Sequence, residues 1–204
     1  VSGKNNTLTN NNITFVIGEL NNVSGNTLHS FVSGKSHTIT NTKRDGAFGE
    51  SHDISGSTNT FTSGKDNAVT IVTNGSVVGI DNIVTGSTTA FIDGSANIVD
   101  NSELMKVIGG GNIVTNTTYS MVKGKNNKDY NGSNNTILGE THDISNSSYV
   151  FMSGYDHTVL SDQYSGAIGK ENSLTSNKTS FVIGEKKVAQ DNESVLITGE
   201  TNDV

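Results

Sequence analysis

Apolar residues recur along this chain at two positions that are fixed relative to a regularly spaced glycine. The residue two places before the glycine is apolar, as at Val77, and so is the residue five places after it, as at Val84. Thr62 and Asp129 break these two columns. A short period kept along a whole chain is typical of a solenoid of stacked repeats. The anchor glycines lie 15 residues apart, with one interval of 16 between the second and the third: Gly3, Gly18, Gly34, Gly49, Gly64, Gly79, Gly94, Gly109, Gly124, Gly139, Gly154, Gly169, Gly184 and Gly199.

Each repeat is predicted to contain two short strands. Aromatic and β-branched residues bounded by Gly, Asn and Ser are typical of strands, as in Ser180–Gly184 before an anchor glycine and His37–Asn41 after one. Two apolar columns on two strands would enclose a narrow core, and the glycine suits a corner that needs a positive φ. The sequence therefore predicts an all-β fold, a parallel β-roll of about 14 coils with a 15-residue repeat.

A third pattern predicts a second apolar surface on the strand that precedes the glycine. Side chains alternate between the faces of a strand, so the residues one and three places before the glycine point away from the core. A bulky apolar residue occupies these two places in alternate repeats. We interpret this stripe as the interface of a parallel homo-oligomer with closed symmetry; the alternative is that both faces lie inside one wider coil. The interface residues are Phe31, Phe48, Phe61, Val78, Phe91, Ile108, Met121, Leu138, Phe151 and Ile168.

Composition narrows the class of protein. Only 31% of the 204 residues are hydrophobic and 16% are charged, which alone would suit a disordered chain, but strict phasing of the valines favours a fold. The net charge of −7 is modest and interspersed, so we expect neither nucleic acid nor an anionic membrane as a partner. The chain begins and ends inside a repeat, and we expect a single domain, residues 1–204, cut from a longer protein. Departures at Lys128–Tyr130 and Lys186–Lys187 are predicted to be local loops or bulges.

Four histidines stand three places after an anchor glycine, in two pairs on adjacent repeats: His37 with His52, and His142 with His157. Stacked imidazoles could share a transition metal, but Asn fills this position in most other repeats, so histidine could equally replace it in a polar ladder. Because spacing fixes no third ligand beside them, we predict no metal and no cofactor.

The sequence predicts no enzyme. His52 and Asp53 are neighbours in a strand, so their side chains point to opposite faces and form no catalytic dyad. The sequence GGGN at Gly109–Asn112 lacks the Lys-Ser/Thr of a phosphate-binding loop.

Receptor contact is predicted where aromatic residues leave the structural columns. Tyr119, Tyr149 and Tyr164 stand five places before their glycines, and Tyr155 directly follows one. Tyrosine is favoured in interfaces for its rigid amphipathic area. The alternative is that these are isolated surface aromatics or part of packing between subunits.

The anchor sequences SFVIG at Ser180–Gly184, SGAIG at Ser165–Gly169 and NGSVVG at Asn74–Gly79 resemble the repeats of YadA-like head domains of trimeric autotransporter adhesins. The Asn or His three places beyond the glycine and the valine five places beyond it add to the resemblance. That family's motif has the form N-S-V-A-I-G-x-x-S, usually in 14-residue repeats. The 15-residue repeat and the alternating phenylalanine depart from it.

The resemblance implies a left-handed parallel β-roll that forms a homotrimer, with a coiled-coil stalk and an outer-membrane β-barrel anchor outside this sequence. It also implies a Gram-negative cell surface and adhesion to host molecules such as collagen, fibronectin, laminin or carcinoembryonic-antigen-related cell adhesion molecules. The composition, rich in Asn and Lys, is similar to that of fusobacterial adhesins of this type, which points to the last of these receptors. The alternative function is a structural spacer that holds a distal binding domain away from the membrane.

Overall fold

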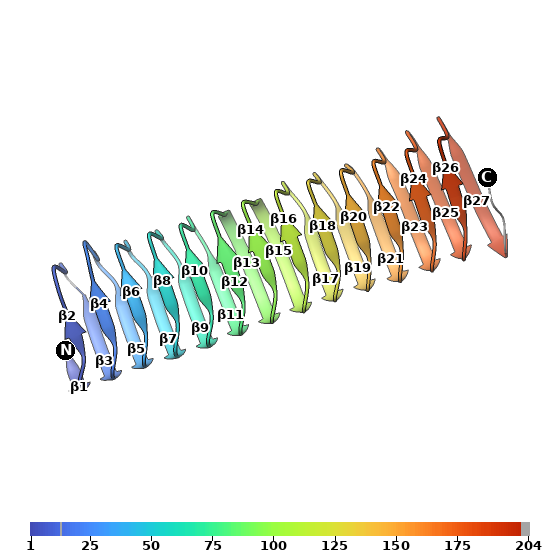
Figure 1. Ribbon diagram of the computed structural model, residues 1–204. Helices are drawn as coiled ribbons and strands as arrows, with labels where there is room; N and C mark the ends of the chain where they lie inside the picture. The colour runs from blue at the N-terminus through green and yellow to red at the C-terminus, as the bar shows by residue number, and fades with distance from the viewer. Residues whose placement is uncertain (13, 201–204) are drawn as a thin grey trace. The chain divides into compact units, whose positions relative to one another are not determined.

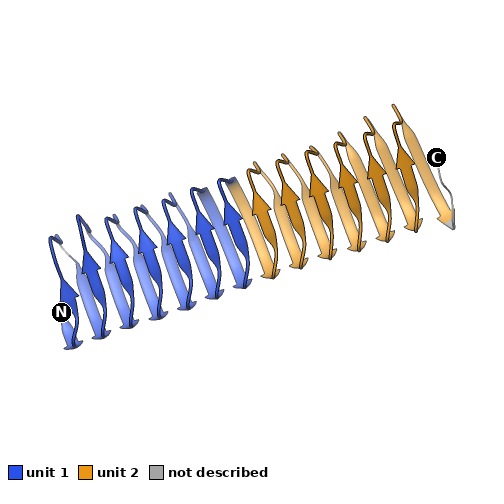
Figure 2. Cartoon of the chain, in the orientation of Figure 1, with its two compact units in different colours: residues 1–103 blue, residues 104–204 orange. Residues whose placement is uncertain are grey.

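The chain folds as an all-β parallel solenoid of about 13 turns with a repeat of about 15 residues. The computed structural model describes residues 1–12 and 14–200, and within these residues every regular element is a β-strand. No helix in the described part is long and apolar enough to cross a bilayer. The chain divides into two compact units, Val1–Glu103 and Leu104–Val204, which Figure 2 shows in blue and orange.

Each turn holds one long strand, which contains the anchor glycine, and one short strand (Figure 1). In the first unit the long strands are β1 (Ser2–Lys4), β3 (Phe15–Glu19), β5 (Phe31–Lys35), β7 (Gly46–Glu50), β9 (Phe61–Lys65), β11 (Ser76–Ile80) and β13 (Thr88–Ser95). Its short strands are β2 (Thr7–Leu8), β4 (Asn22–Ser24), β6 (Thr38–Thr40), β8 (Asp53–Ser55), β10 (Ala68–Thr70), β12 (Ile83–Thr85) and β14 (Ile98–Asp100).

The second unit repeats this arrangement. Its long strands are β15 (Glu103–Gly110), β17 (Met121–Lys125), β19 (Thr136–Glu140), β21 (Phe151–Tyr155), β23 (Ser165–Lys170), β25 (Ser180–Glu185) and β27 (Val195–Glu200). Its short strands are β16 (Ile113–Thr115), β18 (Lys128–Tyr130), β20 (Asp143–Ser145), β22 (Thr158–Leu160), β24 (Ser173–Thr175) and β26 (Val188–Gln190). The fourteenth coil expected from the sequence would be closed by Val204, which lies outside the described residues.

Within each unit the strands pair in parallel with the same kind of strand one turn away, so that equivalent residues stack. Gly64 pairs with Gly79, and Val69 pairs with Val84. In the second unit Gly139 pairs with Gly154 in the same way. The constant register follows from the constant repeat, and it places each sequence column along one line of side chains.

The core contains the two predicted aliphatic columns and three polar ones. In the turn around Gly64, the inward-facing residues are Thr60, Thr62, Asn67, Val69 and Val72, all buried. The sequence predicted the aliphatic columns, and they are confirmed in every turn from Val16 to Ile197 that is aliphatic at these places. The polar columns were missed as core because Ser, Thr and Asn are usually exposed. Here Asn67 is hydrogen-bonded to the next turn, whereas the hydroxyls of Thr60 and Thr62 have no hydrogen-bond partner among the described residues.

The glycine column is required by packing as well as by backbone conformation. Gly64 has φ 116°, and a Cβ atom built on it would collide with the carbonyl oxygen of Gly79. Gly154 has φ 133° and meets Gly169 in the same way. Each glycine therefore makes room for the backbone of the next turn. Because the clashing atoms belong to the backbone, they cannot move aside as the end of a flexible side chain could. The predicted positive φ is confirmed, but the glycine lies near the end of the long strand, as Gly64 does in β9, and not at a corner between strands.

Turns between the strands use further left-handed backbone positions, which explains much of the Asn, Asp and Ser content. Asp66, Ile71 and Asn74 have φ of 53°, 53° and 58° and mark three such positions in one repeat. Asn and Asp tolerate this conformation better than other non-glycine residues. A bulky residue at one of these places, such as Ile71, is therefore unfavourable for the turn itself.

The irregular segments do not interrupt the solenoid. The extra residue of the 16-residue interval lies between Ser24 and Leu28, because Ser24 pairs with Thr40 while Leu28 pairs with Lys43. This agrees with a position after Val23. The predicted loop at Lys128–Tyr130 is wrong: this segment is β18, in register with its neighbours, and it buries Asp129 in the aliphatic column.

At Lys186–Lys187 the residues do lie in a loop, between β25 and β26, but it is the turn that other repeats also have there and not a local irregularity. Lys186 adopts the left-handed turn conformation of its column, with φ 54°, and Lys187 is buried in the Asn/His position. The backbone N–H of Lys187 donates to Oδ1 of Asn172 over 2.9 Å, as an asparagine here would. Backbone hydrogen bonds therefore keep the repeat intact where the side chain departs from it.

Candidate functional site

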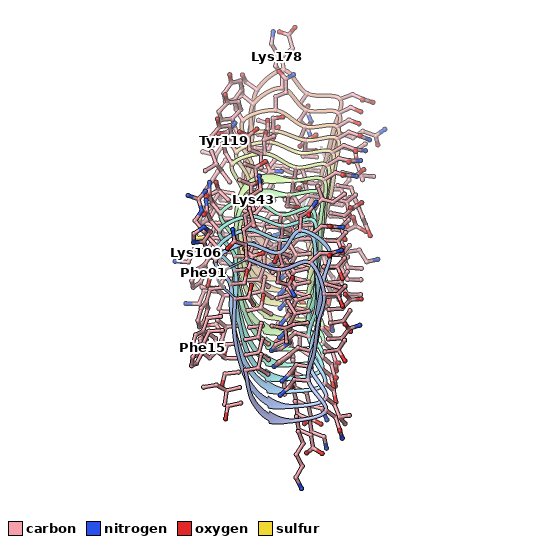
Figure 3. All side chains as sticks on the ribbon, turned by 90° about the vertical axis from the view of Figure 1, so that its left-hand side faces the viewer. Phe15, Lys43, Phe91, Lys106, Tyr119 and Lys178 are labelled. Atoms are coloured by element: carbon pink, nitrogen blue, oxygen red, sulfur yellow. The ribbon has the colours of Figure 1, made fainter. Side chains whose placement is uncertain are left out.

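An apolar surface lies on the outer side of the long strands in the first unit. The side chains of Phe15, Phe31, Phe61 and Phe91 are between 37% and 51% exposed. Figure 3 shows Phe15 and Phe91 on one side of the ribbon with their rings pointing outward. These residues therefore do not lie inside a wider coil, which removes that alternative for the first unit. We call the residues one and three places before each anchor glycine the outer apolar face.

Ring contacts make this face continuous over four turns of the first unit, with two stacked pairs and one tilted pair. The ring centroids of Phe15 and Phe31 are 5.2 Å apart, those of Phe31 and Phe48 are 5.2 Å apart, and those of Phe48 and Phe61 are 5.4 Å apart. Phe48 fits between its neighbours because Gly46, which stands at the other outward position of the same strand, leaves room for its ring. Because the bulky residue alternates between three places and one place before the glycine, each turn presents one large side chain and its neighbours have room for their own.

In the second unit the outer apolar face is more mixed. Phe151 is exposed, and Ile108, Met121, Leu138 and Ile168 are half-buried. Two strands carry apolar residues at both outward positions, a feature that the sequence analysis missed because it followed the alternation. These residues are Phe15 and Ile17 in the first unit, and Phe181 and Ile183 in the second.

The tyrosine column lies on a turn that borders this face. Tyr119, Tyr149 and Tyr164 are each more than half exposed, and the rings of Tyr149 and Tyr164 stack with centroids 4.8 Å apart. Asn134 separates Tyr119 from this pair in the same column. The three tyrosines have φ of 54°, 58° and 49°, in the left-handed region where a large side chain is unfavourable by about 1–2 kcal/mol.

Tyr155 does not join the other tyrosines. It is exposed at the last residue of β21, whereas Tyr149 lies in the turn before the first residue of that strand. An extended strand rises about 3.3 Å per residue, so roughly 20 Å separates the two backbones. The four predicted contact residues therefore form a column of three and one separate tyrosine.

The four histidines form part of a buried hydrogen-bond ladder. His37 and His52 stack with ring centroids 4.9 Å apart, and His142 and His157 do the same at 4.9 Å. Nδ1 of His52 accepts the backbone N–H of Asn67 over 3.3 Å, while its Nε2 lies 2.9 Å from the carbonyl oxygen of Phe48. Since the first contact requires an acceptor and the second a donor, these bonds fix the neutral tautomer with the proton on Nε2.

Asparagine makes the equivalent bonds in other turns. Oδ1 of Asn67 accepts the backbone N–H of Asn82 over 3.0 Å, and its Nδ2 donates to the carbonyl oxygens of Ser63 and Gly79. Histidine therefore replaces asparagine in a polar ladder. Both ring nitrogens of His52 are engaged, and within residues 1–12 and 14–200 no cluster of three or more His, Cys, Asp or Glu could hold a metal ion.

Burial lowers the pKa of all four ladder histidines. The pKa of His142 falls to about 4, first because burial disfavours its charged form and second because His157 lies beside it. Burial lowers the pKa of His37, and the neighbouring His52 adds to the effect. The ladder therefore remains neutral at neutral pH, as its hydrogen-bond pattern requires.

Asp129 is a buried acid that sequence reasoning missed. Its Oδ1 accepts a hydrogen bond from Nδ2 of Asn135 over 3.0 Å, and its Oδ2 has no hydrogen-bond partner among the described residues. Burial raises the pKa of Asp129 to about 6. The break in the aliphatic column was the available signal, but an exposed loop was the simpler interpretation of it.

The His–Asp pairs do not assemble a catalytic dyad. His52 faces the core, whereas Asp53 is exposed on the outer side of the short strand β8. This agrees with the alternation of side chains along a strand. No protein-family model and no curated protein matches this chain.

Proposed function

We propose that this chain is the non-enzymatic head of a trimeric bacterial surface adhesin. The observation that carries the proposal is the outer apolar face, on which the rings of Phe15, Phe31, Phe48 and Phe61 form a continuous row; Phe48 is half-buried and the other three are exposed. Exposed apolar stripes of this kind are covered by a partner in soluble proteins. In the proposed assembly three left-handed β-rolls lie parallel and turn their long strands toward a common axis.

Identical repeats favour identical partners. A stripe that recurs with the period of the fold is matched in register by another copy of the same stripe, and closed cyclic symmetry covers it in every copy. In this proposal a stalk and a membrane anchor outside the sequence hold the head at the cell surface. A head with three equivalent sites would gain avidity toward receptors displayed on a host cell.

The tyrosine column is the proposed receptor contact. Its turn position favours Asn or Gly, and Asn134 occupies it one turn from Tyr149. A tyrosine there carries a conformational cost that stacking between Tyr149 and Tyr164 offsets by about 0.5–1.5 kcal/mol. Residues kept in unfavourable backbone conformations often serve a function rather than stability. The proposed receptor is a host surface glycoprotein of the carcinoembryonic-antigen-related class, or a matrix protein.

A binding assay on the isolated chain tests this proposal. The wild type and the double variant Tyr149→Asn, Tyr164→Asn are applied to immobilised carcinoembryonic-antigen-related receptor ectodomain, collagen, fibronectin and laminin. We expect wild-type binding to one of these ligands, and at least about a tenfold loss in the variant, the size expected for an aromatic hot spot. Tyr155→Lys, which restores the usual charge of its column, is the matched control and should bind normally.

The variant should fold normally, because Asn suits φ near 50–58° at these positions. A trimer that binds no receptor would instead favour a structural spacer that carries a distal binding domain. Equal binding by the wild type and the double variant would remove the tyrosine column from the proposal.

A further inference from the structure

A basic hollow lies on the surface of the first unit, beside the one irregular turn. A cavity of about 260 Å³ is lined by Leu28, His29, Lys43 and Arg44. These residues come from two adjacent turns, since Leu28 pairs with Lys43 and the backbone N–H of Arg44 donates to the carbonyl oxygen of Leu28. The extra residue between Ser24 and Leu28 directly precedes the hollow. The interruption of the 15-residue period and the cavity therefore coincide.

The charge of the hollow contrasts with that of the chain. Arg44 is the only arginine in a sequence with a net charge of −7. Among the residues that the structure describes, no carboxylate lies within ion-pair distance of Lys43, Arg44 or His29, whereas Lys65, Lys170 and Lys186 each have a carboxylate partner. The carboxyl of Asp45, the next residue, is buried and accepts the backbone N–H of Thr60 over 2.7 Å.

The fold does not require these side chains. His29 and Arg44 have φ of 55° and 56°, and the same turn position holds Asn59 and Asn74 in the next two turns. Lys43 occupies the place of Thr58 and Thr73. Arg44, which suits the left-handed turn less well than asparagine does, thus converges with Lys43 and His29 on one cavity.

We infer that this hollow binds an anionic saccharide through a sulfate or carboxylate group. The guanidinium of Arg44 offers paired N–H donors that match either oxyanion, and the Lys43 ammonium adds a second positive charge. The His29 imidazole supplies a further donor, and Leu28 offers an apolar wall for the carbon face of a sugar ring. The cavity has room for a single sugar unit. The site goes beyond the proposed adhesin function and does not depend on the trimer.

Saturation-transfer NMR and titration calorimetry with small probes test the site. The probes are N-acetylglucosamine 6-sulfate, N-acetylneuraminic acid, neutral N-acetylglucosamine and inorganic sulfate. The variants are Arg44→Asn and Lys43→Thr, each of which introduces the residue that the next turn carries at that place. The matched control is Lys178→Thr, which removes an exposed lysine from the same column in the second unit (Figure 3).

We expect wild-type protein to bind at least one acidic sugar and not the neutral one. Arg44→Asn and Lys43→Thr should each weaken that binding by about 10- to 100-fold, the range for a charge-assisted hydrogen bond, while Lys178→Thr binds as the wild type. A preference for N-acetylglucosamine 6-sulfate identifies the bound oxyanion as sulfate, and a preference for N-acetylneuraminic acid identifies it as carboxylate. Binding of inorganic sulfate as tight as that of the sugars, equal loss in Lys178→Thr, or binding unaffected by both pocket variants would overturn the inference. Circular dichroism confirms that each variant is folded.

Discussion

The two units of this solenoid share their interior and differ on their surface. The first unit contains five of the seven phenylalanines and no tyrosine, whereas the second contains all five tyrosines and two phenylalanines. Inside, the same glycine, aliphatic and polar columns run through both, and each unit has one stacked histidine pair. The interior is therefore set by the demands of stacking, and the outside is free to diverge.

This contrast separates the residues that specify the fold from those available for function. An inward position must fit against its neighbour in the next turn, and this demand is strictest at the glycine and aliphatic columns. An outward position makes no such demand on its neighbour, and the departures from Asn at Tyr149 and Arg44 are the basis of the two binding sites proposed above. Substitutions at equivalent inward positions should therefore have the same effect on stability in both units, whereas substitutions at outward positions should differ in their effect.

The largest expected effect is from a methyl group on the glycine column. Gly64→Ala in the first unit and Gly154→Ala in the second should each destabilise the fold by at least about 3 kcal/mol, or prevent folding, because the Cβ atom meets the backbone of the next turn. Gly56→Ala is the control, since its Cβ would meet Ile71 only at ordinary contact distances, 3.4 Å from the side chain and 4.0 Å from the backbone nitrogen. Chemical denaturation measures all three. Equal losses at the three positions would mean that positive φ alone matters.

Breaking the polar ladder should come next in size. His142→Leu removes the acceptor for the backbone N–H of His157 and the donor to the carbonyl oxygen of Leu138. We expect a loss of about 2–5 kcal/mol from two buried unsatisfied groups, and the same for His52→Leu in the first unit. His142→Asn should be nearly neutral, because asparagine makes both bonds elsewhere. If the leucine and asparagine variants unfold at the same denaturant concentration, the ladder does not stabilise the fold.

Acid should weaken the fold through the same histidines. Below pH 6.5 the unfolded chain binds protons at these residues, whereas folded His142, with a pKa of about 4, does not. Stability therefore falls as pH drops from 6.5 towards 4, by about 2 kcal/mol between pH 6.5 and pH 5 for this group. Unfolding free energies measured at both pH values should show a smaller loss in His142→Asn than in the wild type. A larger loss in the variant would contradict the assignment.

Asp129 should change the stability of the fold with pH in the opposite direction to the histidines. Its folded pKa of about 6 lies above the ordinary 3.8, so the ionised carboxyl weakens the fold above pH 6 and the penalty disappears as pH falls towards 4. Asp129→Val restores the aliphatic column between Val114 and Ile144 and should stabilise the protein by about 1–2 kcal/mol at pH 7. The gain should shrink at pH 5. Thermal unfolding of the wild type and the variant at pH 7 and pH 5 measures this gain. A larger stabilisation by Asp129→Val at pH 5 than at pH 7 would contradict the prediction.

Much of the fold could be predicted from the sequence because each inner column is a repeated solution to one stacking problem. The glycines, the aliphatic columns, both strands of each turn and the position of the extra residue followed from phase alone. Burial of Ser57 or Asn67 did not follow, because the hydrogen bonds that satisfy their side chains lie between turns and leave no apolar signal. Asp129 and Lys187 were assigned to local irregularities because their side chains are normally exposed, while the backbone register tolerates them.

The site was less accessible to sequence reasoning. The outward direction of the phenylalanines followed from alternation, but the packing of Phe48 between Phe31 and Phe61 depended on the space left by Gly46. The tyrosine column was found from its irregular composition, whereas its left-handed backbone was visible only in the structure. The basic hollow escaped notice because Leu28 and Arg44 are distant in sequence and meet only when the turns stack.

The most direct test of the account is the molar mass in solution by light scattering, down to nanomolar concentration. Three copies of the 21.4-kDa chain have a mass of 3 × 21.4 = 64.2 kDa, and we predict this mass for the wild type. Phe61→Ser should lower it on dilution, whereas Ile83→Ser, which removes an exposed apolar side chain from a short strand, should leave it unchanged. A folded wild-type monomer of 21.4 kDa at every concentration would contradict the claim that the outer apolar face is an interface between subunits.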